Sequence, residues 1–533
     1  MKLDTKKKII YILFLLVLQL VVLLYFGSQK KGMHFDECFS YFNTNNSVGR
    51  QVYDRTLLTS EDIMKDFYVK PGEQFNYEYV VRLQSYDVHP PVFYIFLHTL
   101  CSFMPGVYSI WQGISLNILY SLITTFFVFH ILDELINNDK IALAITALYA
   151  INTGVICDAM YIRMYCLMTL WIAISIYLHL KMSKIDYNSQ NIPIVFIVVS
   201  SILTYLGFMT HYFYLGFMFF IEAAFWLPRM FKSKKAFIQL LKYGLGLLIA
   251  GILGVLLYPS CLGHVNSGYR GQEVKGYLLD MSDFGNRFQF FDNLINKYVF
   301  NGFLYIYLLI IILLGVFSYY NSKKNKTGLF EDGRFIQCIL IPVLGYYILS
   351  VKCSLMGDEA MMRYQLPIYG LSFICFSYLL YYFVNRIFKG KVQLYLNAIS
   401  LFLILIISFC GLLNKNVFYL YQEQETMENI SESHSSENCV YIYNNEDNKY
   451  FLWNDALQLA KYKNVYFINS ENQEPITESY FSEPHKMIVY ISTLNENEDF
   501  NYYLDLIYKN NNNLHSYEKL YDGMYATCYE FSE

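Results

Sequence analysis

Two acidic side chains stand next to each other early in the chain, in the run His34-Phe35-Asp36-Glu37-Cys38. Adjacent carboxylates can bind a cation together, or one of them can serve as a general base. Two solvated loop acids would look the same in the sequence, and for this pair alone that simpler interpretation is favoured. The pair therefore gains weight only if other polar groups lie near it in space.

A second polar cluster, Tyr86-Asp87-Val88-His89-Pro90-Pro91, opens a short apolar run. The prolines fix their own φ angles and hold His89 in an extended conformation, so Asp87 and His89 project from a stiff turn. A helix that starts with proline in its first turn would explain the prolines. It would not explain the Asp and the His beside them, so both interpretations stay open.

Arginines and histidines recur at the ends of later apolar runs. Arg163 precedes Met164 and Tyr165 in one of them. Snorkelling at a membrane surface is the simpler explanation of such an arginine, and a clamp on an anionic head group is the functional one. A lone histidine such as His211 is more often a satisfied structural group. Other groups in similar positions are His264, Arg270, Asp358, Glu359 and Arg363.

The composition indicates which elements must position these groups. Of the 533 residues, 55% are hydrophobic and only 16% are charged, whereas soluble domains usually carry about 25% charged residues. Long apolar blocks identify a polytopic membrane protein and exclude a cytosolic enzyme or a disordered chain. The net charge of −4 gives no basic field for nucleic acid. Eleven dispersed cysteines without a CxxC pair indicate core-filling thiols, not a zinc site or a disulfide framework.

Eleven apolar blocks approach the length of a membrane-spanning helix. They are Ile9–Phe26, Ile110–Leu132, Ile141–Cys157, Met164–Met182, Ile192–Met209, Tyr212–Leu227, Gly244–Tyr258, Val299–Tyr320, Phe335–Val351, Tyr364–Val384 and Leu394–Leu413.

Loop charge orients these blocks. The apolar run Pro90–Met104 is short for a span and suits an interfacial segment. With that run on the outer surface, three clusters of lysine and arginine fall in the cytoplasm, as the positive-inside rule requires. The clusters lie at 229–235, 323–334 and 386–391. We therefore predict a multi-pass protein of the cell membrane with a cytoplasmic N-terminus and an extracytoplasmic C-terminal domain.

The predicted fold is an all-α polytopic membrane domain over residues 1–413, with outer-face juxtamembrane helices, followed by a small α/β domain over 414–533. Residues 27–109 form the first outer loop with its juxtamembrane segment. Ser260–Lys297 is a second outer loop, in which Gly263, Gly268 and Gly271 are expected to break any helix. In the tail the predicted strands are Cys439–Tyr443, Val465–Ile468, Met487–Ser492 and Tyr525–Phe531, and the helices are Phe451–Lys463 and Tyr502–Asn510.

On this topology all the polar groups above fall on the outer face, although they were not used to derive it. Acids come mainly from the first loop, and arginines and histidines from later loops. Transfer of a sugar from a lipid phosphate to a hydroxyl would require this set of groups. The phosphate leaves as a stable anion, so one carboxylate base and cations for the phosphate suffice. Asp36 or Asp87 would be the base, and Arg163, Arg270, Arg363 and His89 would surround the phosphate.

The residues that carry a resemblance are Asp36-Glu37, the run Asp87 to Tyr94, Arg163-Met164-Tyr165, Thr210-His211-Tyr212, and Arg363-Tyr364 with Pro367. In this order the chain resembles the GT-C superfamily of polyprenyl-phosphate-sugar glycosyltransferases over roughly residues 8–384. This superfamily includes protein O-mannosyltransferases, bacterial aminoarabinose transferases and RgtA/B/C/D-like proteins.

The resemblance implies a membrane glycosyltransferase that moves a sugar from a polyprenyl-phosphate donor to a hydroxyl of a glycan, lipid or protein at the outer face. It implies catalytic roles for Asp36, with Glu37 and Asp87, where Asp36 is the base and Asp87 helps to organise the acceptor or a metal. Later outer loops would contact the lipid phosphate, through His89, Arg163, Tyr165, His211, Arg270 and Arg363. No cofactor is certain, and a divalent cation at Asp36 and Glu37 is left open.

Three alternatives stay open at this stage. A ligase or polymerase of lipid-linked oligosaccharides would use a pyrophosphate-linked donor. A secondary transporter would need ionisable groups near mid-membrane and two similar halves, and the sequence has neither feature. A non-enzymatic sensor would use the tail for binding, but this role would leave the acids of the first loop unexplained.

Overall fold

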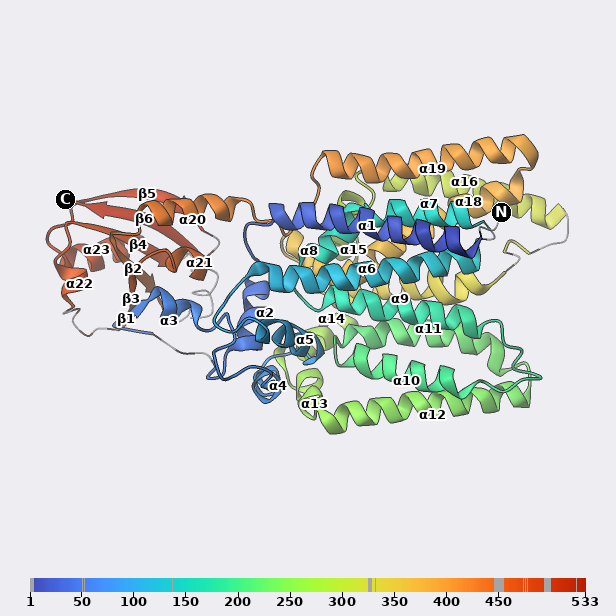
Figure 1. Ribbon diagram of the computed structural model, residues 1–533, viewed down its shortest axis with the longest axis horizontal. Coiled ribbons are helices and arrows are strands. Elements are labelled where there is room, and N and C mark those ends of the chain that lie inside the picture. The colour runs from blue at the N-terminus through green and yellow to red at the C-terminus, as the bar shows by residue number, and fades with distance from the viewer. Residues whose placement is uncertain are drawn as a thin grey trace. The chain divides into compact units, whose positions relative to one another are not determined.

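The computed structural model describes residues 4–49, 51, 53–136, 138–324, 328–330, 332–444, 455–472, 474, 476, 478–492, 500–523 and 525–533. Its elements are labelled in Figure 1. The chain packs into two compact units, which are described separately below. The membrane unit comprises Met1–Gly27, Gln84–Phe93 and Gly113–Phe418, and the second unit comprises Ser28–Leu83, Tyr94–Gln112 and Tyr419–Glu533.

Long apolar helices make up the membrane unit. Within the described residues, eight are long and apolar enough to cross a membrane: α1 (Thr5–Gln29), α6 (Ile110–Leu135), α9 (Tyr165–Met182), α12 (Lys234–Leu257), α16 (Leu304–Lys324), η1 with α17 (Ile336–Cys353), α18 (Leu366–Ile387) and α19 (Gly390–Leu413). A helix form satisfies every backbone polar group inside a bilayer. The prediction of an all-α polytopic membrane domain is thus confirmed.

The three remaining predicted spans also coincide with helices. The block Ile141–Cys157 corresponds to α7 (Asp139–Ala150) and α8 (Thr153–Met160), which are bent by 52° and would bring the count to nine spans. Asn152 explains the bend, because its side chain caps α8 by accepting from Gly154 N and donates to Val299 O instead of continuing the helix. The other two are α10 (Ile194–Phe208) and α11 (Phe213–Met230).

Packing within this unit follows the helix order only in part. α10 lies against α12 and α9, α11 lies against α17, and α18 lies against α16, α9 and α8. In Figure 1 the helices α9 to α12 run alongside one another. The apolar stretch of α18 is 78% buried and that of α12 only 17%, so α18 is a central helix and α12 a peripheral one.

The second outer loop is helical, and the prediction that its glycines break any helix is wrong. It forms α13 (Ser260–Asn266), α14 (Tyr269–Leu279) and α15 (Phe284–Tyr298). A glycine inside a helix costs only about 1 kcal/mol, which tertiary packing outweighs. Gly268 and Gly271 instead allow the α13–α14 corner to close, because a Cβ on either residue would lie within 3 Å of the His264 carbonyl oxygen.

The second unit contains a six-stranded sheet in the order β1-β3-β2-β4-β6-β5. β2 (Asn438–Tyr443) pairs in parallel with β3 (Asn464–Asn469) and β4 (Lys486–Ser492). The other pairs are antiparallel: β1 (Thr56–Thr59) with β3, β6 (Ala526–Ser532) with β4, and β5 (Ser516–Asp522) with β6. All four predicted strands are present. The predicted helix Tyr502–Asn510 is α23 (Phe500–Asn510), and Phe451–Lys463 lies partly outside the described residues, with α21 (Ala456–Leu459) inside them.

Several shorter helices complete this unit: α2 (Phe35–Asn45), α3 (Ser60–Met64), α5 (Val92–Ser102), α20 (Glu423–Ser433) and α22 (Ser479–Ser482), while α4 (Tyr77–Tyr86) lies on the boundary of the two units. The core of the sheet is built from Val440, Ile442, Ile468, Met487, Val489, Ile507 and Phe531. All eleven cysteines are free thiols and ten are buried, as expected for core-filling residues.

Candidate active site

The acidic pair lies in the first turn of α2, in the second unit. His34 caps this helix, since its Nδ1 accepts from Asp36 N at 3.2 Å while its own backbone N donates to Glu37 Oε2 at 2.8 Å. This reciprocal arrangement is a capping box with histidine in the place of serine or threonine. Negative side chains in a first helical turn are also favoured by the helix dipole.

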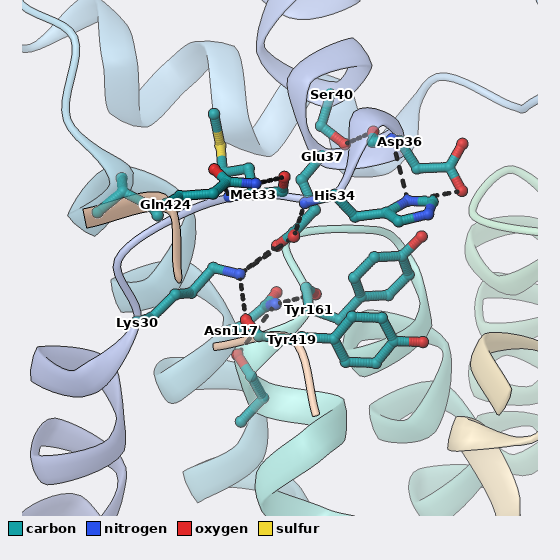
Figure 2. A network of polar contacts seen from close by, with 12 residues as sticks. Lys30, Met33, His34, Asp36, Glu37, Ser40, Asn117, Tyr161, Tyr419 and Gln424 are labelled. Carbon is teal, nitrogen blue, oxygen red and sulfur yellow. Dashed lines mark hydrogen bonds and ion pairs between the residues drawn. The ribbon is translucent and has the colours of Figure 1, made fainter. Parts of the chain in front are cut away.

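The two acids of the pair have different surroundings. Glu37 is fully buried and accepts from Lys30 Nζ at 2.9 Å, and Lys30 is itself buried. The Asp36 side chain is 16% exposed, and its Oδ2 lies 3.6 Å from His34 Nδ1. Figure 2 shows the Lys30 and Glu37 side chains meeting on one side of His34 and the Asp36 carboxylate on the other. Of the two acids, only Asp36 therefore has a side chain that is partly accessible to solvent.

The start of the C-terminal segment holds this turn in place. Lys30 Nζ donates to Tyr419 O at 2.6 Å, and Lys31 N donates to Leu420 O at 2.8 Å. The Gln424 amide bonds both backbone groups of Met33, each at 3.1 Å. These contacts fix the chain that leads into α2, and hence the position of Asp36.

In the membrane unit, Asp87, His89 and Arg163 form a chain of polar contacts. His89 Nδ1 lies 3.0 Å from Asp87 Oδ2, and Arg163 Nη2 lies 3.4 Å from His89 Nδ1. Burial opposes ionisation of Asp87, but His89 and Arg163 outweigh it and lower the pKa of the carboxyl to about 2. Asp87 is thus a carboxylate at neutral pH, paired with a histidine.

Aromatic contacts extend this cluster. The ring of His211 lies 6.1 Å from that of His89 and 5.3 Å from that of Tyr165. Burial lowers the pKa of His211 well below its usual value, and the neighbouring His89 and Arg163 lower it further. His211 is therefore a neutral imidazole at physiological pH.

A cavity of about 440 Å³ opens beside this cluster. One part of its wall is apolar and includes Phe208, Phe213, Leu215, Val265, Val274, Leu278, Leu349 and Leu355. The other part is polar, with His89, His211, His264, Arg270, Glu273, Lys275 and Tyr364. A pocket of 300–1,000 Å³ with an apolar wall and a few polar groups is typical of a small-molecule site.

The α13–α14 corner supplies much of this wall. His264 contacts Tyr212 Oη through Nδ1 at 2.8 Å and Ser85 O through Nε2 at 3.2 Å. A carbonyl can only accept, so Nε2 carries the proton and Nδ1 accepts from the tyrosine. Arg270 Nη1 donates to Glu273 Oε2 at 2.8 Å on α14. Through the contact of His264 with Tyr212, the corner is attached to the turn that carries His211.

Arg363 lies behind the cavity and does not line it. It is buried in the 3₁₀ helix η2 (Glu359–Tyr364), with its guanidinium 5.2 Å from the ring of Tyr364. Tyr364 does line the cavity and contacts Tyr165 with ring centroids 6.4 Å apart.

The membrane unit therefore brings Asp87, His89, Arg163, Tyr165 and His211 together, with Arg270 and the neighbour of Arg363 at the same cavity. Asp36 and Glu37 lie in the second unit. The sequence predicts neither Lys30 nor Lys275 as a site residue, and it places His264 on an outer loop without a role of its own. Lys275 and His264 were findable as polar residues of an outer loop, whereas nothing in the sequence indicated that Lys30 is buried.

Within the described residues, no three His, Cys, Asp or Glu side chains are grouped so that they could hold a metal ion. Both oxygens of Glu37 are engaged, by Lys30 and by His34 N. The Glu37 carboxylate is therefore committed to donors of the protein itself.

No protein-family model and no curated protein matches the sequence. Among solved structures, the chain is similar to ArnT from Cupriavidus metallidurans in the apo state, with 9% identity, a TM-score of 0.53, and 98% of this chain and 97% of that chain covered. The ArnT structure bound to undecaprenyl phosphate gives 9% identity and a TM-score of 0.50 over 98% of both chains. An oligosaccharyltransferase from Archaeoglobus fulgidus gives 10% identity and a TM-score of 0.44 over 95% of this chain and 69% of that chain.

Proposed function

On the GT-C fold that this chain shares with ArnT, we propose that it is a membrane glycosyltransferase that transfers a sugar from a polyprenyl-phosphate donor to a hydroxyl acceptor at the outer face of the membrane. The observation that carries the proposal is the cavity of about 440 Å³, which has an apolar wall on one side and His89, Arg270 and Lys275 on the other. A lipid phosphate has the same two parts, an apolar chain and an anionic head.

In the proposed reaction Asp36 accepts the proton of the acceptor hydroxyl. The hydroxyl oxygen attacks the anomeric carbon, the bond from that carbon to the phosphate oxygen breaks, and polyprenyl phosphate leaves with the bonding electron pair. The pKa of this leaving phosphate is low, so no general acid is required, in contrast to glycoside hydrolysis with its poor alcohol leaving group. A carboxylate is a sufficient base here, because the acceptor hydroxyl becomes acidic only as its oxygen bonds to the anomeric carbon.

Cations at the cavity would stabilise the leaving phosphate. Arg270 and Lys275 line the wall directly, and Arg163 stands behind His89. Charge-assisted hydrogen bonds to a phosphate are about twice as strong as neutral ones, and they strengthen as negative charge develops on the leaving group. Arg363 would act more indirectly, by holding Tyr364 at the cavity.

The proposal gives Glu37 a supporting role and uses no metal step. Its carboxylate balances the charge of Lys30 and caps the backbone at His34, so it positions the turn that carries Asp36. Asp87 likewise orients His89 toward the phosphate side of the cavity.

The test is transfer of radiolabelled sugar from a panel of polyprenyl-monophosphate sugars in membranes that contain the full chain. We expect one donor to label an acceptor in the wild type, and Asp36→Asn to abolish labelling at unchanged expression. Glu78→Gln is the matched control, because it removes an exposed carboxylate in the first turn of α4. Arg270→Ala and Arg363→Ala are expected to raise the donor KM more than they lower kcat.

The same assay separates the alternatives. Labelling only from pyrophosphate-linked oligosaccharides would assign a ligase or polymerase. Full activity of Asp36→Asn would remove Asp36 as the base, and no labelling from any donor by well-folded protein would contradict the enzyme itself.

A further inference from the structure

A second cavity, of about 380 Å³, lies elsewhere in the membrane unit, and none of the residues discussed above lines it. It is formed where α9 ends, at Ser183 and Lys184, by Arg229 in the last turn of α11, and by the segment that leads into the π-helical η1 (Ile336–Leu340). That segment contributes Asp332, Gly333 and Arg334, and Gln337 belongs to η1 itself. The loop-charge pattern predicts that this end of the helices is cytoplasmic.

Arg229 is held in a fixed orientation at this cavity. Its Nη1 donates to Phe225 O at 2.5 Å and to Gln337 Oε1 at 2.8 Å, and its guanidinium stacks 3.9 Å from the Phe225 ring. In the described part of the chain, Nε and Nη2 have no hydrogen-bond partner. A guanidinium oriented in this way loses little conformational entropy when an anion binds its remaining donors.

Arg334 presents a second guanidinium. Its Nε pairs with Asp332 Oδ2, and its backbone N donates to Asp332 Oδ1 at 2.9 Å. The described residues provide no partner for its two terminal nitrogens. Two planar forks with open donors at one cavity match the oxygen atoms of a phosphate.

The local charge favours an anion. Lys181 and Lys184 share one carboxylate, Glu134, at 2.5 Å each. Among the described residues that line the cavity, three side chains are positive and one is negative: Lys184, Arg229 and Arg334 against Asp332. Glu134, which pairs with Lys184, does not line it.

The π-helical turn is a separate indication of function. A π-helix is rare because its wider turn packs less well, and short π segments occur frequently at functional sites. Here the π turn carries Gln337, whose side chain orients Arg229. The π-helical turn thus positions Gln337, which holds Arg229 at the cavity.

We propose that this cavity binds a phosphate group, carried by the head group of an anionic phospholipid or by a soluble phosphate of the cytoplasm. Its volume is within the range of small-molecule pockets, and basic pockets between the cytoplasmic ends of membrane helices are suited to lipid head groups. This site is distinct from the donor cavity, and the proposal does not depend on the glycosyltransferase function.

The experiment uses the full chain, delipidated in a neutral detergent, with phosphatidylglycerol or phosphatidylcholine added and the bound lipid counted by native mass spectrometry. We expect retention of phosphatidylglycerol over phosphatidylcholine by the wild type. Arg229→Gln and Arg334→Gln should each lower this retention about tenfold or more, as loss of a charge-assisted hydrogen bond implies. Lys232→Gln is the control, because Lys232 is exposed three residues beyond Arg229 and does not line the cavity.

Thermal melting in the same detergent provides a second readout that does not depend on lipid counting. Phosphatidylglycerol should raise the melting temperature of the wild type and not that of Arg334→Gln, which carries the test if Arg229→Gln does not fold. Displacement of the lipid by inorganic phosphate or glycerol phosphate would identify a soluble phosphate as the ligand, and resistance would identify the lipid. Equal retention of both lipids by the wild type, or equal retention of phosphatidylglycerol by wild type and both arginine variants, would overturn the proposal.

Discussion

Replacing Lys30 by methionine should loosen the N-terminal turn of α2, because it leaves the Glu37 carboxylate buried without its cation. Both side chains of this ion pair are fully buried, and their atoms approach to 2.9 Å. Removing one partner of a buried pair typically costs about 3–5 kcal/mol, since the remaining charge keeps its desolvation penalty. At about 1.4 kcal/mol per tenfold, opening of this turn should increase between about one hundredfold and a few thousandfold.

Cys38 offers a local assay of this opening. Its thiol is buried one residue after Glu37, and burial and the Glu37 charge raise its pKa above the usual value, so it is protected in the closed state. Labelling by a thiol reagent at fixed pH, followed by mass spectrometry of the Cys38 peptide, reports the open population when reclosing is faster than labelling. The labelling rate of Lys30→Met should therefore rise by the factor given above.

Two further variants test the reasoning. Lys30→Met combined with Glu37→Gln removes both charges and keeps the cap, because glutamine can serve at that position of a capping box. The bond to Tyr419, worth about 0.5–1.5 kcal/mol, and the contact of the ammonium with the Tyr421 ring are then lost, so labelling should fall well below that of Lys30→Met. Lys31→Met is the control, because its pair with Glu425 is exposed and worth at most about 1 kcal/mol. Equal labelling of Lys30→Met and Lys31→Met would refute the argument.

Three further outcomes follow from the membrane unit. The Asp87 pKa of about 2 lies below the unfolded value of about 3.9. The stability that its charge contributes is therefore complete above the unfolded value and disappears as pH falls toward 2. The difference in melting temperature between wild type and Asp87→Asn should shrink as pH falls below about 4. Burial keeps His211 neutral, so the unfolded chain binds more protons below about pH 6.5, and the wild type should lose stability there relative to His211→Gln in the same melting series. Gly271→Ala should raise the donor KM, because the added Cβ would lie 2.4 Å from Val265 O and disturb the cavity wall. Gly276→Ala in the same helix meets open space, so it should be neutral or stabilise the fold by about 0.5–1 kcal/mol. Equal KM values for the two variants would contradict the close packing of the α13–α14 corner.

Features with a strong local pattern could be predicted from the sequence. Each apolar block corresponds to a helix or a bent helix pair, and the central strands β2, β3 and β4 are apolar runs buried on both faces. β5 was not predicted, because the run Ser516–Asp522 is mostly polar and mostly exposed and lacks the alternation that marks a half-buried strand. β1 was also not predicted, since four residues of the first outer loop become a strand only by pairing with β3, more than 400 residues later in the chain.

For the polar residues that tertiary structure brings together, the sequence predicts which residues are candidates but not which of them contact one another. The sequence places Asp87, His89, Arg163 and His211 at the ends of apolar blocks, and these ends meet in the structure. The sequence does not predict the α13–α14 wall of the cavity, because three glycines within nine residues disfavour a helix. What decides this segment is the close packing of a corner, which a propensity scale does not contain.

In the sequence the two adjacent acids Asp36 and Glu37 are equivalent candidates, and the geometry of the helix start distinguishes them. In a helix, neighbouring residues point about 100° apart, so Asp36 and Glu37 cannot both face a substrate once α2 forms. The third residue after the cap is the one whose side chain reaches back to the cap backbone, and here that residue is Glu37. A second requirement acts on the same side chain, because Lys30 is buried and must be neutralised by the nearest acid. Cap and counter-ion together commit Glu37 to the fold, and this leaves Asp36, on the adjoining face of the first turn and partly exposed, as the carboxylate that we propose as the base.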